Sequence, residues 1–207
     1  MKIMPELEIS DLSVHYGTSR GSVHALGNIE FRLEAGESIG IAGESACGKS
    51  TLGLSVMRMI QGGKIISGKI VFDGESTLEM SSSEFDKNIR WKKISMVFQG
   101  AMNSLDPVFT IEHQFDEVLK QHKFKGDSGK VIGDAIRSVN LDSSVLKKYP
   151  HELSGGMKQR IVIAMALLLK PKFVIADEPT TALDVLIQAQ IINLLKNLKK
   201  EGKSLML

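Results

Sequence analysis

The chain has 207 residues, 43% of them hydrophobic and 24% charged, which suits one folded domain with a sizeable core. Its net charge of +2, with both signs mixed along the chain, argues against nucleic acid or an acidic membrane as a direct electrostatic partner. A single cysteine excludes an internal disulfide framework and suits a reducing cytoplasm. The longest apolar run, residues 161–169, is far shorter than the roughly 20 residues that span a bilayer, so membrane contact is expected only through partner proteins.

Apolar and polar residues alternate near the N-terminus, over residues 7–14 and 23–33. This period of two predicts strands of an antiparallel sheet. Short apolar stretches predict further strands over residues 69–72 and 94–98, and Asp73-Gly74 is typical of a turn between elements.

A glycine-rich segment, residues 43–51, fits the phosphate-binding pattern Gly-x4-Gly-Lys-Ser/Thr, in which backbone N–H groups curl round a polyphosphate. Lys49 supplies a positive charge for the phosphates, and the Ser50 hydroxyl is placed to bind Mg²⁺. A strand predicted over 37–42 precedes the segment and a helix predicted over 49–60 follows it, which is the context that the pattern requires. A glycine-rich turn without a ligand is the alternative. The residues of this phosphate loop are Gly43, Glu44, Ser45, Ala46, Cys47, Gly48, Lys49, Ser50 and Thr51.

Helical periodicity appears in the middle and at the end of the chain. The spacing of a capping box opens a short helix over residues 81–92. Two helices are predicted within residues 110–140, with a break at 125–127, and an amphipathic helix over 184–200. Strand and helix therefore alternate around a parallel core, which predicts an α/β fold.

A second helix start that suits an anion lies at residues 153–160, Leu-Ser-Gly-Gly-Met-Lys-Gln-Arg. Ser154 is a good N-cap, and Gly155 and Gly156 leave N–H groups open to an anion. Since one nucleotide already has its phosphates in the first loop, the second start is expected to serve a nucleotide held by another subunit. An ordinary capped helix entry is the alternative.

A compact apolar strand, residues 172–177, ends in two acids. Asp177 at the end of a strand can hold the Mg²⁺ that bridges the phosphates, usually through water. Glu178, directly after it, can act as the base that orients and deprotonates an attacking water. A solvated turn that simply ends a buried strand is the alternative.

Together, the phosphate loop, the segment 153–160 and Ala-Asp-Glu-Pro-Thr-Thr-Ala-Leu-Asp resemble the ATP-binding subunits of ABC transporters over nearly the whole chain. Four further segments are most similar to the dipeptide and oligopeptide importers within that family. They are residues 17–21, 98–99, 103–107 and 149–152.

The resemblance implies a P-loop NTPase (RecA-like) parallel-sheet core with an N-terminal antiparallel β-subdomain and an inserted α-helical subdomain. Residues 1–207 would form a single ABC ATPase domain. Its core would comprise 1–99 and 154–207, and its helical subdomain 100–153.

The resemblance also implies a role for each site residue, with ATP and Mg²⁺ as the cofactors. Tyr16 would stack on adenine, and Gln99 would contact Mg²⁺ or the lytic water and sense the transmembrane partner. The segment Ser154-Gly155-Gly156 would cap the γ-phosphate across a dimer interface, where Asp184 would also lie. The catalytic set would be Glu178, Gln99 and Lys49, and the metal set Ser50, Gln99 and Asp177.

The partners implied are a second ATP-binding subunit, identical or not, and transmembrane permease subunits. The chain would then lie at the cytoplasmic face of the membrane, attached only through the permeases. Dipeptides, oligopeptides and nickel all remain open as the transported solute.

The chain departs from the family pattern in two places. Ala46 stands where relatives usually carry glycine, and a Cβ there would strain the loop if the residue needs a positive φ. The chain also stops at Leu207, before the position where the family places a histidine that contacts the γ-phosphate. We therefore expect a truncated chain that binds nucleotide, is mainly monomeric and hydrolyses ATP weakly.

Two other classes of protein share some of these motifs. A nucleotide-binding module with little or no hydrolysis stays open because of the absent histidine. A soluble ABC ATPase of DNA repair or chromosome organisation is disfavoured, because such proteins need a long coiled coil and residues 52–152 lack sustained heptads.

Overall fold

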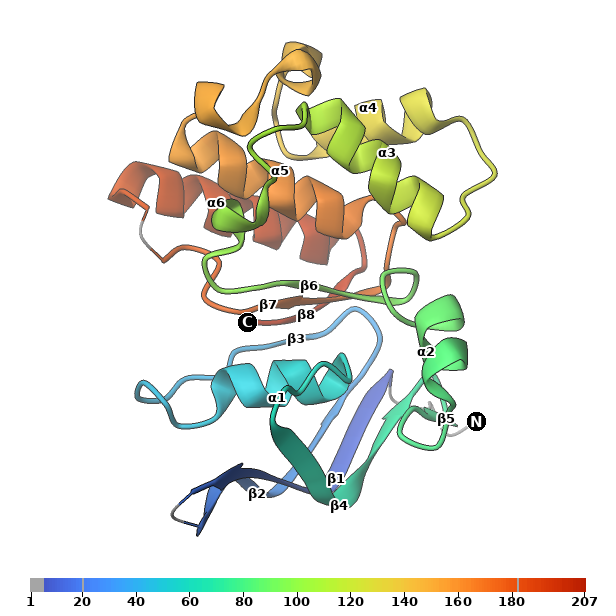
Figure 1. Cartoon of the computed structure of the whole chain (residues 1–207), viewed down its shortest axis with the longest axis vertical. Helices are drawn as coiled ribbons and strands as arrows, with labels where there is room; N and C mark the ends of the chain where they lie inside the picture. Colours follow the sequence, from blue (N-terminus) through green and yellow to red (C-terminus); the bar gives the residue numbers. More distant parts are fainter. Residues whose placement is uncertain (1–5, 20, 182) are drawn as a thin grey trace.

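The structure is a computed structural model that describes residues 6–19, 21–181 and 183–207. Arg20, within the importer-like segment 17–21, lies outside the described residues. Two sheets are stacked in the described part of the chain, with one helix between them and a layer of helices on the far side of the second sheet (Figure 1).

The first sheet is antiparallel, in the strand order β2-β1-β4-β5, and confirms the sheet predicted near the N-terminus. Its strands are β1 (Leu7–Thr18), β2 (Gly21–Leu33), β4 (Gly63–Phe72) and β5 (Glu75–Ser76). β4 begins six residues before the predicted start at residue 69. A register shift between Ser10 and Ser13 explains the difference, because it breaks the period of two where Gly68, at φ +101°, crosses β1.

The second sheet is parallel, in the order β3-β8-β7-β6. Its strands are β3 (Ser38–Ile39), β6 (Ile94–Val97), β7 (Phe173–Ala176) and β8 (Ser204–Met206). Phe173 and Ile175 of β7 point into one buried cluster and Val174 and Ala176 into another. Because both faces of the sheet are covered, the sequences of its strands are continuous apolar runs without alternation.

The helices fall on the two faces of this parallel sheet (Figure 1). They are α1 (Lys49–Val56), α2 (Ser82–Asn88), α3 (Ile111–Gln121), α4 (Ser128–Ser138), α5 (Gly155–Leu167) and α6 (Val185–Lys200), with 3₁₀ turns η1 (Ala101–Ser104), η2 (Ser143–Lys147) and η3 (Pro150–Glu152). Leu52 and Val56 of α1 pack in the cluster shared with the antiparallel sheet, whereas α3 to α6 share the other cluster. The predicted helices therefore all exist.

Two helix ends were predicted too late. α1 ends at Val56 rather than residue 60, because Arg58 adopts φ 53° and turns the chain toward β4. α2 ends at Asn88 rather than residue 92, and Trp91 has φ 66°. The strand predicted over 37–42 is paired as a strand only at 38–39, although the Ile41 N–H still donates to the Leu207 carbonyl over 2.8 Å.

Candidate active site

The phosphate loop joins β3 to α1 and lies at the left of Figure 1. Gly48 has φ 104°, and a Cβ at this position would lie 2.5 Å from the Ala25 carbonyl oxygen of β2. A Cβ on Gly43 would lie 2.6 Å from the Cys47 Sγ. Gly48 is therefore required by its positive φ and by its close approach to the backbone of β2, whereas a Cβ at Gly43 would clash only with the Cys47 side chain.

Lys49 folds its side chain back over this loop. Its Nζ donates to the carbonyl oxygens of Gly43 at 2.8 Å and Glu44 at 2.7 Å, and lies 3.7 Å from the Cys47 Sγ. The positive charge is thus held at the hollow of the loop, next to the N-terminus of α1.

The start of α1 differs from the starts of the other α-helices in the described chain. The side chains that cap those helices are Ser81, Thr110, Asp127, Ser154 and Asp184. The N-cap of α1 is Gly48, which offers no side chain to the first N–H groups of the helix. Those groups and the Lys49 ammonium together fit an anionic ligand such as the phosphates of a nucleotide.

Ala46 has φ 64°. This is the positive backbone angle at which a Cβ was expected to strain the loop. An L-residue in this left-handed region costs about 1–2 kcal/mol. The loop keeps its shape with alanine at this cost, so the substitution does not remove the candidate site.

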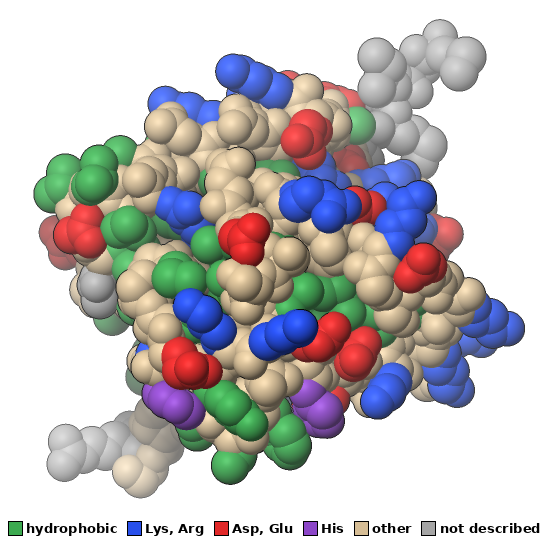
Figure 2. Space-filling view, turned by 90° about the horizontal axis from the view of Figure 1, so that it is seen from above, with side chains coloured by type: hydrophobic (Ala, Val, Ile, Leu, Met, Phe, Trp, Pro, Cys, Tyr) green, Lys and Arg blue, Asp and Glu red, His purple; other side chains and the backbone are tan. Residues whose placement is uncertain are grey.

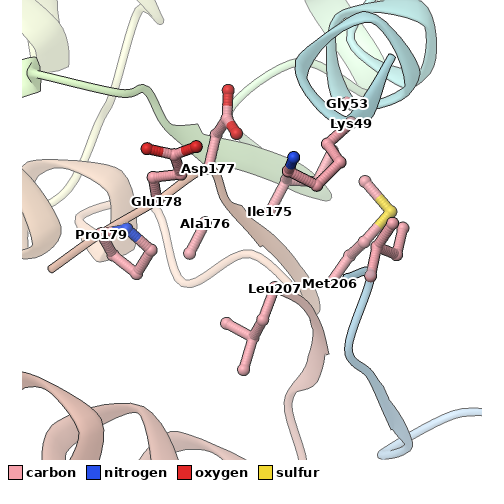
Figure 3. A pocket seen from close by; sticks show the side chains of 10 residues that line it. Lys49, Gly53, Ile175, Ala176, Asp177, Glu178, Pro179, Met206 and Leu207 are labelled. Carbon is pink, nitrogen blue, oxygen red and sulfur yellow. The ribbon is translucent and has the colours of Figure 1, made fainter. Parts of the chain in front are cut away.

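The acidic pair follows β7 directly. The Asp177 N–H donates to the Val97 carbonyl of β6 over 2.9 Å, which fixes where the strand ends. Asp177, Glu178 and Lys49 line one pocket of about 150 Å³, together with Gly53 of α1 and Leu207 (Figure 3). Figure 3 shows the two carboxylates side by side above the strand and the Lys49 amine across from Asp177.

Glu178 is held by two side chains from different parts of the chain. Gln99 Nε2 donates to Glu178 Oε2 over 2.9 Å, and Thr181 Oγ1 donates to the same oxygen over 2.9 Å. Gln159, a buried residue of α5, donates through Nε2 to the Pro179 carbonyl over 2.8 Å and anchors the loop that follows.

Gln99 and Glu178 were predicted from the sequence as site residues, whereas Thr181 and Gln159 were not. A hydroxyl three residues after the acid was the available signal for Thr181.

The other residues that the resemblance implies as metal ligands lie beside residues of this pocket. Ser50 occupies the first turn of α1 beside Lys49. Hydroxyl, amide and carboxylate oxygens are the ligands that Mg²⁺ prefers, so Ser50, Gln99 and Asp177 fit a magnesium ion held together with phosphates.

Tyr16 of β1 lies next to the same helix start. Its hydroxyl is 3.4 Å from the Thr51 Oγ1, and its ring packs so closely on β4 that a Cβ on Gly63 would lie 2.8 Å from it. The structure thus brings Tyr16 to the edge of the phosphate loop.

The second helix start is not part of this pocket. α5 lies on the opposite face of the parallel sheet from α1 (Figure 1). Ser154 Oγ accepts from the Met157 N–H over 3.3 Å, so the predicted cap is confirmed. Gly156 is buried so tightly that a Cβ there would lie 2.9 Å from Ile187 of α6. Ser154, Gly155 and Gly156 are therefore separated from Lys49 within one chain by the sheet itself.

The phosphate loop, the acidic strand end and the capped glycine helix start are thus all present at the positions that the resemblance implies. Residues 26–181 match the protein family described as ABC transporter. The chain belongs to the ABC transporter family.

Several members of the ABC transporter family resemble the chain closely. The oligopeptide transport ATP-binding protein OppD of Escherichia coli is 42% identical over 200 residues, which cover 94% of this chain and 59% of that protein. The dipeptide transport ATP-binding protein DppD of Escherichia coli is 41% identical over 210 residues, covering 99% of this chain and 64% of that protein. The chain spans about three fifths of the length of the first of these curated relatives.

Solved ABC cassettes share the fold. A dimeric structure of the ATP-binding cassette MJ0796, in a post-hydrolysis state bound to ADP and Pi, superposes with a TM-score of 0.84 at 28% identity. The match covers 97% of this chain and 86% of that one. The predicted P-loop NTPase fold is therefore confirmed. In the part of the chain that the structure describes, no helix combines the length and hydropathy needed to cross a bilayer.

Proposed function

We propose that the chain binds and hydrolyses ATP as the motor part of an importer for dipeptides or oligopeptides. The names of the curated relatives support peptide import, since OppD and DppD are oligopeptide and dipeptide transport proteins. The same relatives favour a transporter over an ATPase of DNA repair or a nickel importer. We place the protein at the cytoplasmic face of a membrane, held there by permease subunits.

The observation that carries the proposal is the fixed orientation of Glu178. Its Oε2 accepts from both Gln99 and Thr181 at 2.9 Å, and no described residue donates to the other oxygen, which is available to accept a proton from water. A carboxylate with one oxygen held and one open is a general base positioned before the substrate arrives.

The other residues of the pocket hold the nucleotide in this proposal. Lys49 has three N–H bonds: two have carbonyl partners, and the third has only the weak acceptor Cys47 Sγ and is available to a phosphate oxygen. Ser50 and Asp177 would hold Mg²⁺, which would supply positive charge to neutralise the phosphates. Tyr16 offers a flat face to the adenine ring.

Two copies would complete two sites. Ser154 uses one lone pair to cap α5, so its hydroxyl hydrogen remains able to donate to a phosphate held by the partner copy. The edge at which α5 and α6 begin, at the left of Figure 1, carries exposed apolar side chains (Figure 2), and Val185 and Leu186 at the start of α6 are 82% and 70% exposed. We place Asp184 in this interface, and residues 100–153 in a helical subdomain that carries Ser154 toward it.

The segment after Gln99 is our candidate contact with a permease. Gln114 of α3 fixes this segment with three hydrogen bonds of 3.0 Å to backbone groups of Asp106 and Phe109. Val108 is 72% exposed and Phe109 40% exposed on the same loop. Crosslinking from cysteines placed at residues 100–109 to a co-expressed permease should succeed, and crosslinks only from the opposite face would rule this contact out.

The proposed hydrolysis is tested by comparing turnover with binding in Glu178→Gln. The amide keeps the shape but cannot take the proton, so turnover should fall by about a hundredfold while ATP affinity stays within about twofold. Glu117→Gln, an exposed carboxylate of α3, is the matched control and should change neither quantity. Binding without turnover in the unaltered chain would instead favour a nucleotide-binding module.

A further inference from the structure

Two histidines face each other on the antiparallel sheet. His15 of β1 and His24 of β2 are direct partners across the strand ladder. Their rings are stacked, with centroids 3.8 Å apart and planes inclined by 10°. Residues that are direct partners in a ladder point to the same face, so this pair is fixed by the register of the sheet.

The pair lies on the face of the sheet that points away from the phosphate loop. Tyr16, the next residue of β1, reaches Thr51 of α1, and successive side chains of a strand point to opposite faces. In the stacked arrangement the nitrogen lone pairs of the two rings do not converge, so both rings must rotate to hold one ion; His24 is exposed and His15 half-buried, which leaves space for that rotation. Lys64 of β4 is the partner of His15 on its other side and completes a row of three side chains.

Imidazole is the commonest metal ligand in proteins and suits zinc, nickel and copper ions. We propose that His15 and His24 form a two-histidine clip that chelates one such divalent ion, with water in the remaining positions. Among the described residues no group of three or more His, Cys, Asp or Glu side chains is placed to hold a metal. The proposed site therefore has only two protein ligands. The chelation is independent of the proposed ATPase activity.

A bound ion would link β1 and β2, the two strands that pack against the phosphate loop and the start of α1. Ala25 and Leu26, which follow His24, pack directly on Gly48, and Tyr16, which follows His15, contacts Thr51. An ion that binds only the folded pair stabilises the folded state by mass action.

The test is a calorimetric titration with NiCl₂ of the chain without a polyhistidine tag and without nucleotide. Every variant carries Cys47→Ser, so that the exposed thiol does not contribute. We expect one ion per chain, and an affinity that falls about tenfold or more in either His15→Gln or His24→Gln, because a second ligand on the same scaffold acts at high effective concentration. The double variant should lose little more than either single one, since a chelate is already broken by the first substitution.

Two further variants make the test specific. His151→Gln removes a histidine that is stacked on Tyr149 and should leave the affinity unchanged. Lys64→Gln removes a positive charge beside the clip and should tighten binding. Unaltered affinity in the single variants, or two losses that simply add, would overturn the proposal. Unfolding curves without metal check that each variant is folded.

Discussion

The side chain of Glu178 is positioned by residues that the chain brings together only after folding. Gln99 follows β6 and Thr181 lies in the loop after β7, yet both donate to one oxygen. Glu178 itself has φ 47°, and such a backbone persists only where its surroundings determine it. Gln159 bonded to the Pro179 carbonyl supplies part of that restraint. The acid was recognisable from sequence because it ends an apolar strand, whereas Gln159 acts across 20 residues and leaves no local pattern.

Thr181 is a positioning residue in this account. Thr181→Val keeps the shape but removes the hydroxyl that orients Glu178, so kcat should fall about tenfold, equivalent to about 1.4 kcal/mol, with ATP affinity unchanged. Thr181→Ser should restore the rate, because it keeps the donor. Thr180→Val is the control, since Thr180 contributes its backbone carbonyl rather than its hydroxyl to Gln188. A rate unaffected by Thr181→Val would show that this hydrogen bond does not position the base.

Lys49 should be essential for nucleotide binding. If ATP binds only the folded state, a hundredfold excess over its Kd adds about 2.7 kcal/mol to the free energy of unfolding. Thermal unfolding with and without Mg-ATP should show this shift in the unaltered chain and in Lys196→Ala, an exposed lysine of α6. Lys49→Ala should abolish it. A shift that survives in Lys49→Ala would mean that the nucleotide binds elsewhere.

At the scale of the elements, local signals were reliable at helix starts and correct for the end of α6, but they failed at the ends of α1 and α2. Ser154 and Ser81 act as caps as predicted, because a hydroxyl before a helix satisfies its first N–H groups whatever surrounds it. Arg58 ends α1 early through tertiary contacts, with its guanidinium bonded to the Thr77 and Met80 carbonyls and packed over the Phe85 ring at 5.1 Å. The apolar periodicity of the sequence does not depend on such contacts, so it could not predict where α1 ends.

The two sheets are joined by a buried polar contact that should make stability depend on pH. The Ser204 hydroxyl of β8 donates to the Glu6 carboxylate and accepts from the Gly36 N–H over 2.8 Å. Burial is the main cause that raises the pKa of Glu6 above its ordinary value of 4.5. The folded state therefore holds this proton more tightly than the unfolded state. The contribution of Glu6 to stability falls as the pH rises from the unfolded pKa through the folded one.

Glu6→Gln tests this contact because the amide oxygen can still accept from Ser204. At neutral pH the variant should unfold at a higher denaturant concentration than the unaltered chain, since no charge is buried. The difference should shrink as the pH falls below the ordinary range of a glutamate. A midpoint difference that is constant between neutral and acid pH would exclude Glu6 as the source.

At the scale of the whole molecule, the parallel sheet separates the two helix starts that we propose to bind phosphate. α1 lies on one face with Lys49, and α5 on the other with Ser154, so one chain cannot close both around the same phosphate. The sequence predicted that the second start serves a nucleotide of another subunit, because the first loop already holds the phosphates of one nucleotide, but it did not place the two starts on opposite faces of the sheet. The paired arrangement of two copies could not be derived from the chain alone, since it depends on surfaces such as the exposed start of α6.

Mixing two inactive variants tests this composite site most directly. Lys49→Ala keeps the α5 start but lacks the phosphate loop charge, and Ser154→Arg keeps the loop but blocks the α5 start. Neither variant alone contains a complete site in a paired arrangement. A mixed pair contains one, formed by the loop of the second variant and the α5 start of the first. We expect the mixture to hydrolyse ATP faster than the sum of the two variants measured separately. A rate equal to that sum would contradict a site shared between two copies.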